Sequence, residues 1–92
     1  MAEQVEESLA ELREQEPQHP TAEEAEHWLE IYEQLIAMTE VMMARTRDYL
    51  SGLHPPARQH VERVNVQIME EELAGFRERH QVWAARVHAL ED

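Results

Sequence analysis

The sequence contains no cysteine. Disulfides, thiolate metal sites and cysteine nucleophiles are therefore excluded. A chain of 92 residues forms one domain at most, and a domain this small buries too little surface to be robust by itself. Oligomerisation is one of the usual remaining sources of stability for such a chain.

Lysine is also absent, and glycine is scarce. All eight basic residues are arginine, and only two glycines are present. Because these glycines are isolated, no glycine-rich loop is available to cradle a phosphate. Ser8 and Ser51 lie in no nucleophile motif. We therefore expect neither enzymatic activity nor a cofactor.

Long apolar runs are missing from the sequence. No stretch reaches the length needed to span a bilayer. The first residues, MAEQVEESLAEL, are acidic and lack the apolar centre of a secretory signal. We expect a cytoplasmic protein without a membrane partner, and the absence of cysteine fits a reducing compartment.

Acidic charge is abundant and unevenly distributed. The formal net charge is −12, and residues 1–40 contain twelve Glu but only one Arg. Residues 41–92 contain eight acids and seven Arg. Because strong negative charge opposes binding to nucleic acid phosphates and anionic membranes, direct nucleic acid binding is disfavoured and a basic protein partner is expected.

The residues that dominate, Ala, Glu, Leu and Arg, favour an all-α fold. Residues 1–20 are predicted to form an acidic N-terminal helix with a proline-containing linker, and Val5, Leu9 and Leu12 give that helix a thin apolar edge. Because an isolated helix of this length is marginal in water, we expect it to behave as a separable arm. The sequence leaves open whether it docks on its own subunit or on another.

Residues 21–92 are predicted to form an antiparallel helical hairpin, with helices at about 21–51 and 56–90. The first of these begins with the capping box formed by Thr21 and Glu24.

The turn between the two helices reads SGLHPP. Gly52 suits the left-handed position after the first helix, and Leu53 suits the hydrophobic contact that follows it. Pro56 suits the first position of the second helix.

The last helix carries a heptad seam with alternating spacings of three and four. Its members are Val66, Met69, Leu73, Phe76, His80, Trp83, Val87 and Leu90. The upstream apolar residues follow a seam offset by two positions, so the phase changes near 64–66. Either the helix breaks there, with Asn65 as the N-cap, or it continues through a stutter, and we favour a break or a sharp kink.

The helix predicted at 21–51 has two apolar seams, which together cover about 180° of its surface at 100° per residue, against roughly 100° for an ordinary surface helix. One seam consists of Trp28, Ile31, Leu35, Met38, Met42 and Tyr49. The other consists of Leu29, Tyr32, Ile36, Met43 and Leu50. The last helix can cover only one seam, so we expect a homodimer in which two hairpins form a four-helix bundle.

The spacing of charges also favours contacts between helices. No acid lies three or four residues before an Arg, which is the favourable order within a helix. Only the weaker reverse order occurs, as in Arg13–Glu16. Either the opposite charges pair between helices, or the spacing is accidental and the charges form a solvated surface.

Several candidate site residues have a simpler structural interpretation. Glu24 and His27 have the Glu-x-x-His spacing of metal-binding helical bundles, but Glu24 also belongs to the capping box. His80 lies in the seam as either a hydrogen-bonded core residue or a pH-sensitive group. Trp28 and Trp83 are predicted to stack at the end of the hairpin far from the turn.

Basic residues gather near the turn end of the predicted hairpin. They are Arg45, Arg47, Arg58 and Arg63. A contact between this basic turn end and an acidic helix is the interpretation we favour.

These patterns predict a non-enzymatic interaction or regulatory module. The main alternative is an inhibitor that mimics nucleic acid by presenting carboxylates to a DNA- or RNA-binding protein. A metal-binding helical bundle is the remaining alternative. The sequence does not identify the partner or the biological process.

Overall fold

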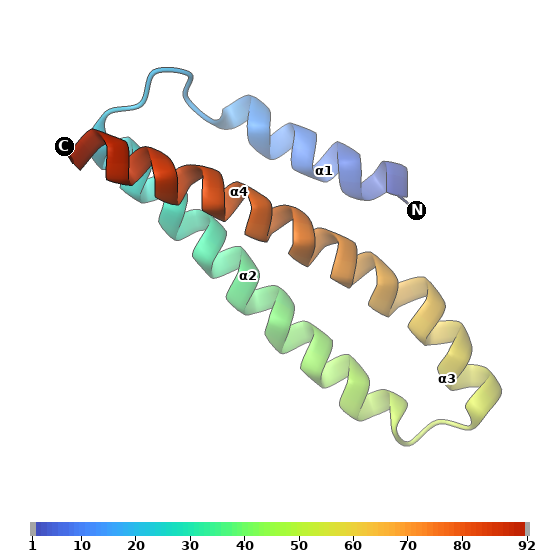
Figure 1. The fold of residues 1–92 in the computed structure, drawn as a ribbon. Helices are drawn as coiled ribbons and strands as arrows, with labels where there is room; N and C mark the ends of the chain where they lie inside the picture. Colours follow the sequence, from blue (N-terminus) through green and yellow to red (C-terminus); the bar gives the residue numbers. More distant parts are fainter. Residues whose placement is uncertain (1, 92) are drawn as a thin grey trace.

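The computed structural model describes the backbone of residues 2–91 and the side chains of residues 5–91. Its helices are α1 (Ala2–Gln15), α2 (Ala22–Leu50), α3 (Pro55–Val61), the π-helix η1 (Glu62–Val66) and α4 (Gln67–Glu91). The predicted all-α class and the antiparallel pairing of α2 with α4 are both confirmed. The fold is elongated, 54 × 23 × 14 Å, and α1 lies along the middle of α4 (Figure 1).

The start of α2 follows the prediction. The Thr21 hydroxyl accepts a hydrogen bond from the Glu24 amide, and the Glu24 carboxylate accepts one from the Thr21 amide, each at 3.1 Å. This reciprocal capping box satisfies two amides that the first turn of a helix leaves without partners. The linker and the capping box together set where α2 begins.

The end of α2 differs from the prediction at one residue. Among the residues described, no glycine has a positive φ, so the left-handed conformation predicted for Gly52 is wrong. The chain turns instead through short-range bonds, from the Gly52 amide to the Tyr49 carbonyl at 3.2 Å and from the Leu53 amide to the Leu50 carbonyl at 3.0 Å. Leu53 still packs against the core beneath the turn.

The helical path continues through the region where the phase changes. A π-helical turn at Glu62–Val66 occupies the place where we predicted a break or a sharp kink, and Asn65 lies inside it rather than at an N-cap. The π turn holds one more residue than an α turn. Val61 and Val66 are five positions apart, and both pack against the same core cluster. The extra residue therefore accounts for the change of phase, and the helix bends there (Figure 1).

Two hydrophobic clusters hold α2 against the last helix. The cluster far from the turn has as its buried members Ala25, Tyr32, Phe76 and Trp83. The cluster near the turn has as its buried members Met43, Leu50, Val66 and Leu73. The predicted stacking of Trp28 on Trp83 is confirmed, with ring centroids 6.1 Å apart and planes at 23°.

Helix α1 packs chiefly on α4 of its own chain. Its predicted apolar edge is confirmed, because Val5 is buried and both Leu9 and Leu12 pack against the cluster far from the turn. Gly75 allows the close approach of the two helices. A Cβ at this position would lie 2.5 Å from Cδ1 of Leu9.

Charged side chains pair between helices, which is one of the two outcomes that the spacing of charges left open. Arg47 of α2 lies 3.3 Å from Glu70 of α4, and Arg77 of α4 lies 3.5 Å from Glu40 of α2. Both pairs are exposed, so each contributes at most about 1 kcal/mol. The two hydrophobic clusters therefore hold α2 against α4 more than these ion pairs do.

None of the helices within residues 2–91 combines the length and the apolar character that crossing a membrane requires.

Candidate functional site

An apolar strip of α2 remains exposed after the hairpin has formed. Its members are Met38, Val41, Met42 and Tyr49, which are 54%, 49%, 50% and 68% exposed, respectively. We call these four residues the outer stripe. They lie on the half of α2 nearer the turn, and Thr39, Met43 and Leu50 occupy the buried face of the same segment. This half of α2 is therefore apolar on two faces, of which only one is covered.

The seam that contains most of the outer stripe differs along its length. Trp28 and Leu35, in the first half of α2, pack against the cluster far from the turn, where Leu9 and Leu12 also pack. Met38, Met42 and Tyr49 continue the seam but stay exposed.

The structure sorts the residues predicted for the core and dimer face into three groups. Buried are Tyr32, Met43, Leu50, Leu73, Phe76 and Trp83. Half-buried are Trp28, Leu29, Ile31, Leu35, Ile36, Met69, His80 and Val87. Exposed are Met38, Met42, Tyr49 and Leu90. Val41 belongs to the outer stripe but to neither predicted seam. It follows Met38 by three residues, and this helical spacing could have placed it on the same face.

A buried polar cluster joins α1 to the hairpin. At its centre is Glu16, which follows α1 directly and precedes the helix-ending Pro17. Its Oε2 accepts hydrogen bonds from the Tyr32 hydroxyl and from Nε1 of Trp83, both at 2.8 Å, and from Nε of Arg79 at 3.3 Å. Nη2 of Arg79 donates a further bond to Oε1. The Glu16 side chain is only 5% exposed.

Electrostatics favours the charged form of Glu16. Burial raises the pKa of its carboxyl, but the hydrogen bonds from Arg79, Trp83 and Tyr32 and the charge of Arg79 outweigh burial and hold that pKa below its usual value. Burial, together with the hydrogen bond to Glu16 and its charge, raises the pKa of the Tyr32 hydroxyl to about 12. The cluster is thus held as a carboxylate, a guanidinium and a neutral phenol.

Sequence reasoning missed this cluster, since Glu16 was considered only for its unfavourable spacing from Arg13. The structure pairs it with Arg79. A signal was available, because the polar atoms of a buried Tyr and a buried Trp usually need partners. Tyr32, Arg79 and Trp83 all donate hydrogen bonds to Glu16, so the cluster fastens the end of α1 to the hairpin.

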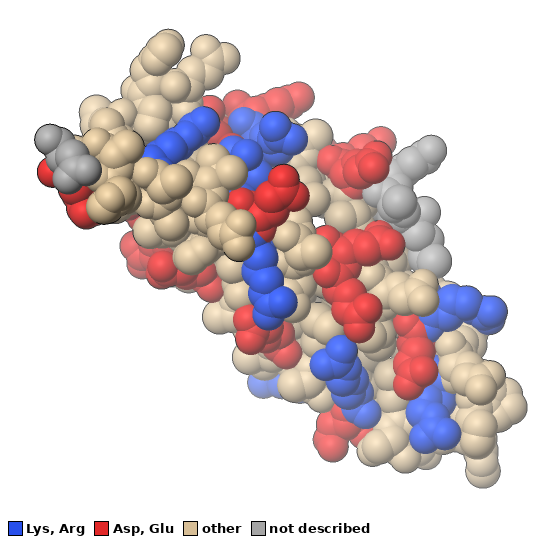
Figure 2. Space-filling model, in the orientation of Figure 1, with Lys and Arg blue, Asp and Glu red and all other residues tan. Residues whose placement is uncertain are grey.

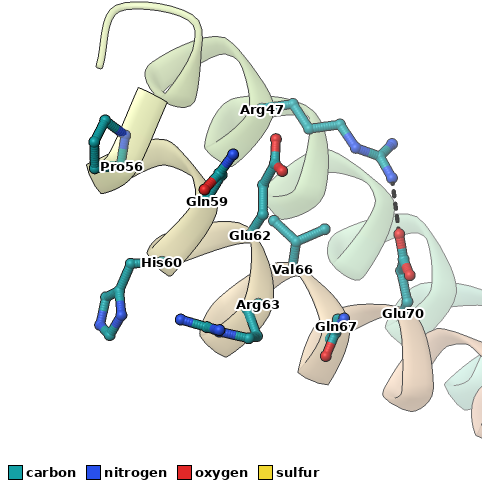
Figure 3. Close-up of a pocket in the computed structure, with 9 residues that line it drawn as sticks. All are labelled: Arg47, Pro56, Gln59, His60, Glu62, Arg63, Val66, Gln67 and Glu70. Carbon is teal, nitrogen blue, oxygen red and sulfur yellow. Dashed lines mark hydrogen bonds and ion pairs between the residues drawn. The ribbon is translucent and has the colours of Figure 1, made fainter. Parts of the chain in front are cut away.

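A shallow hollow of about 650 Å³ opens beside η1 at the turn end (Figure 3). Of the four arginines predicted for the basic turn end, Arg47 and Arg63 line it, whereas Arg45 and Arg58 do not. Glu62 and Glu70 also line it, and Arg47 is already paired with Glu70. Acids therefore offset the arginines, and the hollow has no single sign of charge.

The remaining candidates make ordinary structural contacts. Nε2 of His80 lies 3.4 Å from Oε1 of Glu33, which links α4 to α2 at the edge of the core. Glu24 is engaged in its capping box, and His27 is exposed. Within the described part of the chain, no three His, Asp or Glu side chains are close enough to hold a metal ion.

Charge on the visible face is mixed rather than arranged in continuous acidic rows. Figure 2 shows acidic side chains interspersed with arginines along the length of the molecule.

Comparisons with protein-family models, curated proteins and solved structures find no match to this chain.

Proposed function

We propose that the protein is a non-enzymatic interaction module that works as a homodimer. Two copies pair through the outer stripe of α2, and the two hairpins together form a four-helix bundle. The observation that carries the proposal is the exposure of four large apolar side chains on one face of α2. Exposed apolar surface of this kind, bordered by polar residues, is typical of protein interaction sites.

The energetics of the outer stripe suit a dimer. Burying a large apolar side chain stabilises by about 1.5–3 kcal/mol, and about half of each stripe residue is still exposed. Eight such half-exposed side chains from two copies could contribute on the order of 8 kcal/mol. A micromolar dimer needs about 8 kcal/mol after the costs of association, so residues beside the stripe must also contribute.

The acidic half of the chain supports a second contact, with a basic protein. Residues 1–40 contain twelve of the twenty acids and one of the eight arginines. Glu6, Glu7, Glu11 and Glu14 of α1 are exposed, while its apolar edge packs inward. A dimer would present two such acidic helices, and complementary charge would accelerate and orient the approach of a basic partner.

Sedimentation equilibrium at micromolar concentration tests the dimer. We expect the natural chain to be dimeric and Met42→Glu to be monomeric, because the substitution places a charge in the outer stripe. Ala37→Glu adds the same charge at another exposed position of α2 and should remain dimeric. A fully helical natural chain that sediments as a monomer would overturn the dimer.

Affinity capture from native cell extract at low salt tests the basic partner. The full chain should retain a basic protein, and a chain lacking residues 1–19 should retain less of it. DNA that displaced this protein would instead support the alternative of a nucleic acid mimic. Empty capture by the full chain would contradict both functions.

A further inference from the structure

The face of α2 that carries the outer stripe has a self-complementary arrangement. Six positions follow one another at alternating spacings of four and three residues. They are Ile31, Leu35, Met38, Met42, Arg45 and Tyr49, and we call them the dimer seam. Read from either end, the spacings are the same, with the midpoint between Met38 and Met42. An antiparallel second copy would therefore present the same seam in matching order.

We propose that a second copy of the chain docks antiparallel on this seam, with a two-fold axis passing beside the midpoint of Met38 and Met42. Met38 of one copy then packs against Met42 of the other. Leu35 faces Arg45, and Ile31 faces Tyr49. This inference rests on the proposed homodimer and assigns its geometry.

The exposed surface of the seam is adequate for the pairing. Met38, Met42 and Tyr49 are at least half exposed, and Ile31 and Leu35 are half-buried. Large side chains bury roughly 150–250 Å² when fully covered. The remaining exposed parts of the seam and of Val41 therefore bring the area buried across two copies to roughly 1,000 Å², the least that a specific interface should bury.

Charge favours the antiparallel direction over the parallel one. Arg45 is the only charged member of the seam. In a parallel dimer the two copies of Arg45 would face each other. In the antiparallel dimer each faces Leu35, and the two arginines lie about ten residues, or roughly 15 Å, apart along the helix axis. Leu35 can pack against the methylene groups of Arg45 while the guanidinium reaches solvent.

Two exposed residues at the same heptad position distinguish the two directions. Val41 and Asp48 are seven residues apart and flank the seam on the same side. In the antiparallel dimer the two copies of Val41 lie together beside the axis. The two copies of Asp48 are then separated by roughly 24 Å along the helix axis. In a parallel dimer each pair would lie at equal height on opposite sides of the seam, so both pairs would be equally far apart.

The natural absence of cysteine makes this difference measurable. Single-cysteine variants Val41→Cys, Asp48→Cys and Ala37→Cys would be treated with a short bismaleimide, after sedimentation has measured the oligomeric state of each. We expect Val41→Cys to cross-link into covalent dimers at least tenfold faster than Asp48→Cys. Ala37→Cys, outside the seam, gives the rate of random collision.

The alternative outcomes separate this inference from the function on which it rests. Equally fast cross-linking at positions 41 and 48 would establish a parallel dimer and overturn the antiparallel register, leaving the homodimer intact. Dimers by sedimentation in which position 41 cross-links no faster than position 37 would place the interface elsewhere and also overturn the register. Monomers at every concentration would overturn both proposals.

Discussion

Nε1 of Trp83 donates a hydrogen bond of 2.8 Å to Oε2 of Glu16, across 67 residues of sequence. The same indole stacks on Trp28, so the residue that anchors the end of α1 also belongs to the centre of the hairpin core. Arg79 and Tyr32 complete the anchor from α4 and α2. The carboxylate of Glu16 therefore joins the end of α1 to both helices of the hairpin, beside the contacts of its apolar edge.

Glu16→Gln should loosen α1. The substitution removes the charge that compensates Arg79, whose side chain is only 16% exposed. Breaking a buried ion pair by changing one partner costs about 3 kcal/mol or more. We expect a loss of this order in urea unfolding, with faster hydrogen exchange concentrated in residues 5–15.

Glu14→Gln is the matched control, because Glu14 is an exposed acid of the same helix. It should change the free energy of unfolding by less than about 0.5 kcal/mol. If both variants behaved alike, Glu16 would have no special part in the attachment of α1, and the docked helix would depend on its apolar edge alone.

Acid should release α1 through the same carboxyl. The pKa of Glu16 is lower in the folded chain than its ordinary value of about 4.3. The carboxylate therefore contributes stability above the ordinary pKa, and this contribution is lost as the pH falls through the lower, folded pKa. We expect α1 to stay docked at pH 5–7 and to exchange faster below about pH 4.

Hydrogen exchange at several pH values, corrected for the intrinsic pH dependence of exchange, measures this transition. Glu16→Gln serves as the reference, because it has no carboxyl to protonate at this position. A transition of α1 that persisted unchanged in the variant would assign the acid sensitivity to other carboxyls.

The fold could be predicted well from the sequence because its signals are local. The capping box of Thr21 and Glu24 and the seam that contains Phe76 and Trp83 require only spacing within one helix. The π turn was harder, since a change of phase fits a break as well as an extra residue. The hydrogen bond from the Gln67 amide to the Glu62 carbonyl, five residues earlier, decides for the extra residue.

The anchor at Glu16 was not predictable in the same way. Tyr32, Arg79 and Trp83 lie on two different helices, and nothing in their spacing points to an acid beyond α1. These three residues bind Glu16 because its carboxylate is buried among them. That burial depends on how α1, α2 and α4 pack together, which the sequence does not show. The outer stripe was easier to predict from the sequence. The apolar residues of α2 cover a face wider than one partner helix can bury, and this width follows from their spacing alone.

Gly75→Ala should weaken the contact between α1 and α4. The added Cβ would lie 2.5 Å from Cδ1 of Leu9, so the leucine must move away. Alanine also favours the helical state of α4 by up to about 1 kcal/mol relative to glycine. We therefore expect faster exchange in α1 while the hairpin stays as stable as before, or becomes more so.

Two comparisons isolate the role of Leu9. Gly52→Ala should leave α1 unaffected, because a Cβ there meets only the Tyr49 carbonyl, at an ordinary 3.6 Å. In a Leu9→Ala background, Gly75→Ala should cause no further increase in the hydrogen exchange of α1. An additive loss in the double variant would contradict direct contact between these two positions.

Salt should strengthen the proposed homodimer and weaken the proposed binding to a basic protein. Each copy has a formal net charge of −12, so two copies repel each other, while their seam is apolar apart from Arg45. Screening acts over about 10 Å at 0.1 M salt and about 3 Å at 1 M. We expect the dissociation constant of the dimer, measured by sedimentation, to fall several-fold between these two concentrations.

Attraction of the acidic half to a basic partner should decrease over the same range. A dimer that dissociated as salt rose would be held by ion pairs, such as acidic α1 against arginines of the other copy, and the apolar seam would then not be its principal contact.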